Sequence, residues 1–235
     1  MPGIGADLAL VRLLQLADSA FPSGAYTLSH GLETLVADGA IVGETQVRDV
    51  IRVHLLGRLA WSDLAVVGAA HAAVDGSADP GRRIEELDRR LTASKLAADD
   101  RRASERVGRR LATEVGRFVA SPPLDAFIAA IEGGRCPGNH AVAFGLSGAA
   151  LGVGQRQTML AAASNAVGGL VSAAIRLAVI GHGAGQRLIA GAGPDILEAV
   201  DRAERMDPLD LRPSAPHLEV ALARHETADV RLFAS

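Results

Sequence analysis

The chain has 235 residues, of which 49% are hydrophobic and only 3% aromatic. This length fits one large domain or two small ones, and the apolar content is ample for a core. The net charge of −3 argues against a nucleic-acid partner, because nucleic-acid-binding domains usually carry a basic patch. The single cysteine, Cys136, cannot form an internal disulfide, so we expect a reducing, cytoplasmic location.

Two segments bear on membrane association. The first residues, MPGIGADLALVRLL, lack the basic start and the long apolar stretch of a signal peptide. Residues 158–181 are long and apolar enough to suggest a membrane span. However, Asn165 and Arg176 fall inside this stretch, and a charge within lipid is costly. We therefore expect a buried helix of a soluble bundle and no membrane partner.

The first forty residues predict two helices separated by a turn. Strand signals are nearly absent, whereas apolar residues recur at helical spacing. The first helix is predicted over residues 7–17, with a leucine-rich face. Pro22 and Gly24 favour a turn over residues 18–24, and a second helix should follow over 26–38.

The middle of the chain predicts longer helices. Residues 44–74 form one helical pattern, and residues 82–119 form another that is rich in charge. Ser121 followed by Pro122 is typical of a helix start, because proline suits the first helical position. A loop is predicted over residues 135–140.

The last hundred residues predict further helices over 140–152, 156–180, 186–190 and 194–206, with a glycine-rich break over 181–185. The final segment, 206–235, carries three prolines, so we expect an irregular tail with one helical piece over 216–226. No internal repeat or strong boundary divides the chain. We predict an all-α fold, a single-domain helical bundle over residues 1–235 whose tail, 206–235, is partly irregular.

Several familiar sites can be set aside. The chain lacks the G-x-x-x-x-G-K-[ST] pattern of a nucleotide-binding P-loop. Cys136 and His140 lie four residues apart across a Pro-Gly loop, but two ligands fall short of the four that a closed metal site generally needs. We therefore assign no catalytic residues, no metal ligands and no tightly bound cofactor to this chain.

The stretch DSAFPSGAYTLSHGLE, residues 18–33, gathers polar side chains of several kinds. On the predicted second helix, four of them fall at spacings of three and four residues and would share one face. These are Tyr26, Ser29, His30 and Glu33. Such a stripe is either the solvated side of an amphipathic helix or a functional surface, and spacing alone does not separate the two.

Five segments in order resemble the urease accessory protein UreF family. The segment LLQLADSAFPSGAYTLSHGLE (13–33) is similar to the family's N-terminal signature. The others are ASERVGRRL (103–111), HAVAFGLSGAALGV (140–153), NAVGGLVSAAIRL (165–177) and SAPHLEVALARHETADVRLFAS (214–235). One departure is VIGHGAGQ (179–186), where the family commonly has a Pro-Leu-Gly-Gln-like segment.

The resemblance implies an all-helical, usually dimeric protein that is not itself an enzyme. Members of this family join UreD, also called UreH, and the GTPase UreG in a complex that acts on apo-urease. That complex delivers nickel to the urease active site, which also needs a carbamylated lysine. The resemblance thus implies a scaffold that bridges UreG to UreD and urease, with nickel handled by the complex. It also leaves open a role in regulating GTP hydrolysis by UreG.

We expect the partner-binding residues to lie in two places. Tyrosine and arginine are favoured where interfaces concentrate their binding energy, and a proline-rich tail can become ordered when a partner docks. The N-terminal candidates are Tyr26, Ser29, His30 and Glu33. The tail candidates are Arg224, His225, Glu226, Arg231 and Phe233.

Two other functions stay open from the sequence. The chain could be a helical-bundle hydrolase that uses Glu33 and His30 as acid–base groups, although acid–base catalysis needs a nucleophile or metal beside the base. It could also activate GTP hydrolysis, which would require an arginine that reaches the nucleotide of UreG. Nothing in the sequence identifies that arginine.

Overall fold

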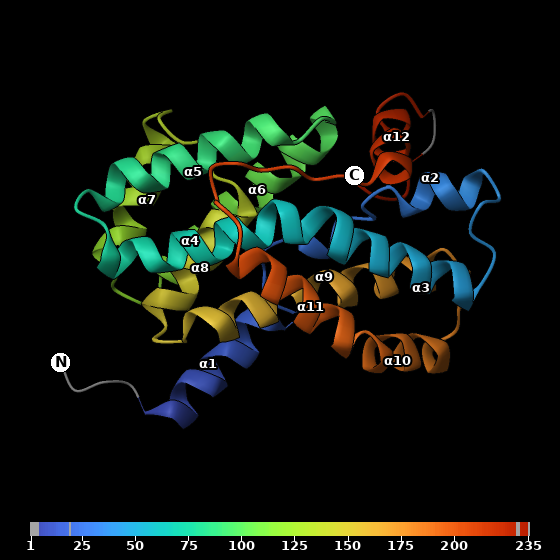
Figure 1. Ribbon diagram of the computed structural model, residues 1–235, viewed down its shortest axis with the longest axis horizontal. Helices are drawn as coiled ribbons and strands as arrows, with labels where there is room; N and C mark the ends of the chain where they lie inside the picture. The colour runs from blue at the N-terminus through green and yellow to red at the C-terminus, as the bar shows by residue number, and fades with distance from the viewer. Residues whose placement is uncertain (1–4, 19, 229–230, 235) are drawn as a thin grey trace.

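The computed structural model of the chain describes residues 5–18, 20–228 and 231–234. Within these ranges it contains twelve α-helices and no β-strand, which confirms the predicted all-α class (Figure 1). The helices are α1 (Ala6–Ala17), α2 (Leu32–Ala37), α3 (Glu44–Val53), α4 (Asp63–Gly76), α5 (Pro80–Ser94), α6 (Ala98–Gly116), α7 (Pro122–Glu132), α8 (His140–Ala150), α9 (Gln155–Arg176), α10 (His182–Gly191), α11 (Gly193–Glu204) and α12 (Pro216–His225).

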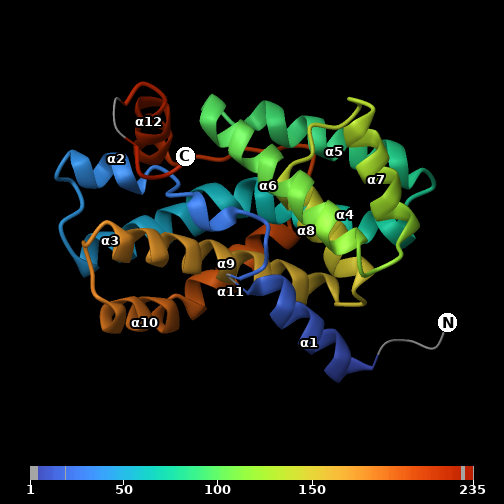
Figure 2. The same cartoon turned by 180° about the vertical axis from the view of Figure 1, so that it is seen from behind.

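Helices α4, α8 and α9 form the centre of the bundle. Helix α8 packs between α4 and α6, and α9 packs against α4, α10 and α11 (Figures 1 and 2). Glycines allow this close approach. A Cβ atom on Gly145 of α8 would lie 2.4 Å from the carbonyl oxygen of Val67, and one on Gly108 of α6 would lie 2.3 Å from that of Gly138.

The two longest predicted helices are each interrupted. A π-helical turn at His54–Arg58 and a 3₁₀ turn at Leu59–Trp61 separate α3 from α4. The second pattern breaks between α5 and α6, where Lys95 has an extended backbone. The Lys95 side chain is buried there beside two carboxylates. Tertiary contact with those charges therefore overrides the helical pattern.

The predicted helix over residues 26–38 is wrong in its first half, because α2 begins only at Leu32. Gly24, His30 and Gly31 all have positive φ angles, which a right-handed helix cannot accommodate. A short 3₁₀ turn at Ala25–Thr27 occupies this part instead.

The predicted glycine-rich break over residues 181–185 is also wrong. Helix α10 already begins at His182, directly after Gly181. The chain turns earlier, at Ala178, whose φ angle is positive.

Helix α9 is long and apolar enough to cross a membrane, by length and composition only. Half of its most apolar stretch is buried inside the molecule, and it packs against α4, α10 and α11. The apolar composition of α9 is therefore explained by its packing in the core, as we expected for residues 158–181.

The two ends of the chain differ in how they pack. Helix α1 extends away from the bundle, and its Leu10 and Leu14 are exposed (Figure 2). Helix α12 lies beside α2 at the other end of the molecule (Figures 1 and 2). The irregular chain before α12 is fixed to the turn after α3, because the backbone N–H of Ser214 donates to the carbonyl of Gly57 at 2.8 Å.

Candidate functional site

Within the polar stretch, residues 20–31 form a turned segment and not one face of a helix. Tyr26 is 52% exposed, whereas Ser29 is fully buried. One nitrogen of His30 is buried as well. The prediction that these side chains share one helix face is therefore wrong, because the positive φ angles at His30 and Gly31 separate them from α2.

Glu33, in the first turn of α2, binds the chain's C-terminal segment. Its carboxylate accepts hydrogen bonds from the backbone N–H groups of Leu232, at 2.7 Å, and Phe233, at 3.2 Å. His225 Nε2, at the end of α12, lies 3.1 Å from the same carboxylate. A charged acceptor on backbone donors makes a strong hydrogen bond, so Glu33 holds the tail against α2.

Glu226 and Arg231 attach the tail to the start of α6. Glu226 Oε1 accepts from the backbone N–H groups of Ala98 and Asp99, at 2.5 and 3.2 Å. These donors belong to the first turn of α6, where a carboxylate is favoured by the helix dipole. Arg231 Nη1 donates to Asp99 Oδ2 at 3.0 Å.

An arginine of α9 joins the two ends of the chain. The guanidinium carbon of Arg176 lies 3.9 Å from the ring centre of Tyr26 and 4.2 Å from that of Phe233. Arg176 Nη2 also donates to the backbone carbonyl of Tyr26 at 2.6 Å. The cation is therefore placed to interact with both aromatic rings.

The N-terminal and tail candidates thus meet in one region, which we call the tail-binding network. Arg224 adds an exposed ion pair with Asp38, its Nη2 lying 3.0 Å from Asp38 Oδ1. His225 and Phe233 are buried. The network consists of Tyr26, Glu33, Asp38, Asp99, Arg176, Arg224, His225, Glu226, Arg231 and Phe233.

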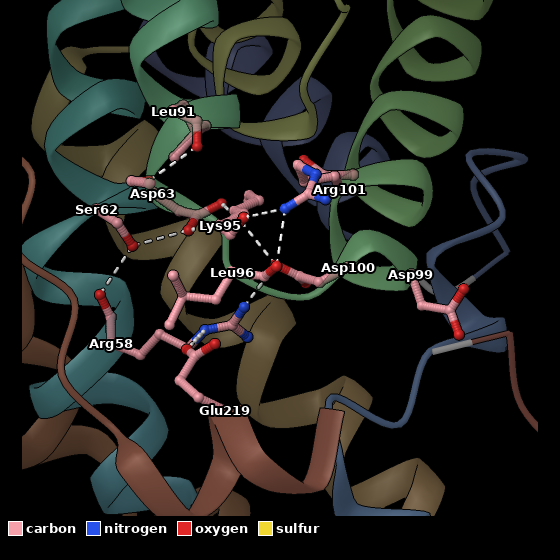
Figure 3. A network of polar contacts seen from close by, with 12 residues as sticks. Arg58, Ser62, Asp63, Leu91, Lys95, Leu96, Asp99, Asp100, Arg101 and Glu219 are labelled. Carbon is pink, nitrogen blue, oxygen red and sulfur yellow. Dashed lines mark hydrogen bonds and ion pairs between the residues drawn. The ribbon is translucent and has the colours of Figure 1, made fainter. Parts of the chain in front are cut away.

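A second set of charges lies beneath the tail, and the sequence did not reveal it. Figure 3 shows Arg58 reaching both Asp100 and Glu219, at 2.5 and 3.0 Å. Lys95 Nζ lies 3.0 Å from Asp63 Oδ1 and 3.5 Å from Asp100 Oδ2. We call these five residues the buried charge cluster. Glu219 belongs to α12, so the tail also completes an interior ion pair.

The pKa values of Arg58, Asp63, Lys95 and Asp100 are all shifted in the direction that favours the ionised form. Burial alone would raise the pKa of Asp100, but Arg58 and Lys95 hold it far below its usual value. Burial would lower the pKa of Lys95, but Asp100 and Asp63 raise it above its usual value. The charges are therefore compensated inside the protein, where an unpaired charge would be very costly.

A cavity of about 450 Å³ lies next to this cluster and is bordered by the N-terminal segment, α4, α8 and α9. Three histidines line it, His30, His54 and His140, together with Lys95 and Asp100. Burial lowers the pKa of both His30 and His140 to about 4 and that of His54 well below its usual value. All three imidazoles are thus uncharged at neutral pH.

Cys136 and His140, the candidate metal pair weighed from the sequence, do not form a site. Burial, with Asp88 and Glu85 nearby, raises the pKa of the Cys136 thiol to about 12, so the metal-binding thiolate is disfavoured. The ring of His140 instead contacts Phe144 edge-on, with the ring centres 5.5 Å apart. Among residues 5–18, 20–228 and 231–234, no three or more His, Cys, Asp or Glu side chains converge as a metal site.

Sequence reasoning missed Arg58, Lys95, Asp100 and Arg176 as structural or functional residues. Two of them carry a readable signal, since Arg58 is the single charge of the apolar stretch 53–62 and Arg176 that of the stretch 158–181. A charge in such a position must find a partner, which here comes from a distant part of the chain.

Comparison with known proteins agrees with this architecture. A sequence model of the UreF family matches residues 41–193. The urease accessory protein UreF of Arthrobacter sp. strain FB24 is 34% identical and is aligned over 96% of both chains. Those of Bacillus sp. strain TB-90 and Lachnoclostridium phytofermentans are 31% and 30% identical, over 96% and 97% of this chain and 99% and 100% of theirs.

The family model leaves out both ends of the chain, but the full-length relatives include them. The resemblance noted in the sequence is thereby confirmed. The chain belongs to the UreF family of urease accessory proteins and is an accessory factor in urease maturation, not an enzyme.

Proposed function

We propose that this chain is the scaffold of a cytoplasmic nickel-insertion complex, in which it bridges the GTPase UreG to UreD and apo-urease. The family supports a role in urease maturation. The observation that carries the finer proposal is the tail-binding network, in which the two terminal segments, outside the family model, form one surface.

Tyr26, Arg224 and Arg231 are exposed side chains of this surface that are suited to anchor a partner. Each is fixed by a neighbour: Tyr26 by Arg176, Arg224 by Asp38 and Arg231 by Asp99. Pre-ordered side chains lose less conformational entropy on binding, and tyrosine and arginine are favoured interface anchors. We assign this face to UreD.

The other predicted contact residues support this face from behind. Ser29, His225 and Phe233 are buried, so they position exposed neighbours and do not themselves cover a partner. Glu33 and Glu226 bind backbone N–H groups of this same chain. Their assignment as partner-binding residues stays a prediction, with an indirect role.

The alternative hydrolase would use Glu33 and His30 as acid–base groups, but both side chains have other contacts in the structure. The carboxylate of Glu33 is taken up by the tail amides and His225. The ring of His30 faces that of His54, with ring centres 5.0 Å apart. The chain's membership of a family of accessory proteins agrees with this result.

The scaffold proposal is tested by co-purification with UreD and UreG, followed by urease activation. Tyr26→Ala and Arg231→Ala should weaken the capture of UreD and reduce activation, since both side chains lie on the proposed face. Arg117→Ala removes an exposed arginine that directly follows the far end of α6, and it should change neither. Wild-type capture of UreD by both face variants would reject the assignment.

Deletion of residues 214–235 is not a usable test. Leu218 and Leu222 of α12 are buried, and Glu219 pairs with the buried Arg58. Removal of α12 would expose core surface and leave a buried charge short of a partner, so this deletion should destabilise the body as well as any contact with UreD.

Two further parts of the proposal concern assembly and regulation. We expect a homodimer, which light scattering at micromolar concentration should report as twice the chain's mass. We also expect this chain to change the turnover of GTP by UreG, which is measured with and without the chain. A monomeric mass would reject the homodimer. An unchanged GTP turnover in the assembled complex would reject the regulatory role.

A further inference from the structure

The outer face of α6 carries a row of arginines that the proposed function does not use. Helix α6 lies with α5 and α7 on one side of the bundle (Figures 1 and 2). Its apolar face is buried and packs against α8. Arg102, Arg106 and Arg110 follow one another at intervals of four residues on the opposite, exposed side. Four residues advance a helix by about 6 Å, so these side chains form a regular row.

The loop between α7 and α8 extends this row toward α5. Arg109 Nε of α6 donates to the backbone carbonyl of Pro137 at 2.8 Å. In the same loop, the backbone carbonyl of Arg135 accepts from Arg89 Nη1 of α5 at 3.3 Å. Exposed arginines from two helices and one loop thus adjoin, and we call them the arginine surface. It consists of Arg89, Arg102, Arg106, Arg109, Arg110 and Arg135.

The carboxylates that pair with this surface lie beneath its guanidinium groups. In the pair of Arg102 with Asp99, the arginine side chain is 65% exposed and the aspartate side chain only 8%. Glu85 pairs with both Arg89 and Arg135, and it is 25% exposed against 53% and 57% for the arginines. Solvent therefore meets mainly positive charge here, although acidic residues are close by.

Two arginines of the surface have no acidic partner in this chain. Arg106 and Arg110 make no side-chain hydrogen bond and no ion pair with any residue that the structure describes. Their planar guanidinium groups keep all their donors for another molecule. A guanidinium binds a carboxylate through two parallel hydrogen bonds, which gives the contact a defined geometry.

We propose that the arginine surface binds an acidic segment of another protein, in which carboxylates recur about every 6 Å. Glutamates at every fourth position of a helix have this spacing, which matches the row on α6. The charge of such a segment is complementary to the surface, and complementary charge speeds association and selects the partner. This inference does not rest on the assignment of the tail-binding network to UreD.

Other partners with negative charge fit this surface less well. Single-stranded nucleic acid is usually bound with aromatic side chains that stack on its bases, and residues 98–116 of α6 include none. A helix that lies on an anionic membrane exposes large apolar side chains, whereas the apolar side chains of α6 are buried. The net charge of −3 also disfavours a general affinity for polyanions.

The test measures binding of the full-length chain to a fluorescently labelled helical peptide that carries glutamate at every fourth position. The control peptide has glutamine at the same positions, and fluorescence anisotropy reports both. At an ionic strength of about 0.01 M, only the acidic peptide should bind. At about 1 M that binding should be lost, because the screening length falls from about 30 Å to about 3 Å.

Matched variants then locate the binding surface. Arg106→Gln together with Arg110→Gln should weaken peptide binding by about threefold to tenfold, since two exposed charge pairs are lost. Glutamine has a helix propensity close to that of arginine, so circular dichroism should show an intact fold. Arg106→Lys with Arg110→Lys keeps both charges and should keep most of the affinity. Arg205→Gln removes an exposed arginine without a side-chain partner among the described residues, after α11, and should leave the affinity unchanged.

Four results would overturn the proposal. Two are unchanged affinity in the double glutamine variant and an equal loss in Arg205→Gln, which would reflect net charge alone. The third is tighter binding, at the same ionic strength, of a DNA duplex or of phosphatidylserine vesicles, which would assign the surface to phosphate groups. The fourth is a changed mass of the double variant in light scattering, which would assign it to a second copy of this chain. Capture of UreD is measured separately, so failure of this inference is distinguishable from failure of the scaffold.

Discussion

The tail-binding network and the buried charge cluster both attach α12 to the rest of the molecule, yet water reaches them very differently. In the buried charge cluster, the side chains of Arg58, Lys95 and Asp100 are at most 7% exposed. In the tail-binding network, Arg231 is 38% and Arg224 is 59% exposed. The buried charges depend on partners within this chain. Water or another protein can replace the contacts of the exposed charges.

The comparison predicts that the largest effect follows from breaking the buried charge cluster. Asp100→Ala leaves Arg58 and Lys95 without their shared carboxylate and should reduce the free energy of unfolding by about 3–5 kcal/mol. Urea-induced unfolding followed by circular dichroism measures this loss.

Asp210→Ala is the matched control, because it breaks the exposed pair with Arg212. Its effect should stay within about 0.5 kcal/mol. Equal losses for the two variants would contradict the distinction between buried and exposed charge sets.

Beside the buried cluster, His140 should make stability depend on pH. Burial lowers its pKa to about 4, with Asp63 opposing this and Lys95 adding to it. Unfolded histidine titrates near pH 6.5, so the unfolded chain binds more protons between pH 6.5 and 4. Stability should therefore fall as the pH falls through this window, by on the order of 2 kcal/mol from His140. His140→Gln should flatten that part of the profile, and identical profiles for the two proteins would contradict the expectation.

In the tail-binding network, the loss of stability should be smaller and confined to the tail. Glu33→Gln removes the charged acceptor of two backbone N–H groups and should cost about 1–3 kcal/mol. Hydrogen exchange should become faster at Leu232 and Phe233 while the amides of α8 keep their protection. Glu114→Gln, in a pair with Arg117 on α6, should leave exchange in the tail unchanged. Faster exchange throughout the protein would show that the tail is part of the cooperative core.

The smallest effect is expected at the outer edge of the same network. Arg176→Lys keeps the charge but loses the planar group placed against Tyr26 and Phe233, at a cost of about 1 kcal/mol or less. Tyr26 is the only tyrosine, so its ring NMR signals report the change directly. The exposed Arg205→Lys, after α11, should leave those signals in place, and unchanged signals in Arg176→Lys would argue against the aromatic contact.

Local signals in the sequence predicted the helices where they were strong. Helix α7 begins at Pro122 directly after Ser121, and α12 lies within the helical piece expected in the tail. The interruptions were not predictable in this way. Lys95 leaves the helical pattern to reach Asp63, a contact that spans 32 residues of sequence.

The candidate site shows the same limit. The resemblance pointed to both Tyr26 and Phe233, but only the fold shows that Arg176 connects them. Helical spacing placed Ser29 and His30 on an outer face because it assumed a helix. The positive φ angle of His30 is uncommon for a residue other than glycine, and no local pattern predicts it.

The ion pair between Arg58 and Glu219 has a consequence for biosynthesis. Arg58 is made long before Glu219, and synthesis at roughly 5–20 residues per second separates them by many seconds. During that interval a growing chain has its α4, α6 and α8 segments but not the α12 carboxylate that completes the interior. The nascent protein should therefore remain incompletely folded and dependent on chaperones until α12 emerges from the ribosome. Ribosome-stalled chains that end before α12 should then be degraded by proteases more rapidly than the finished chain.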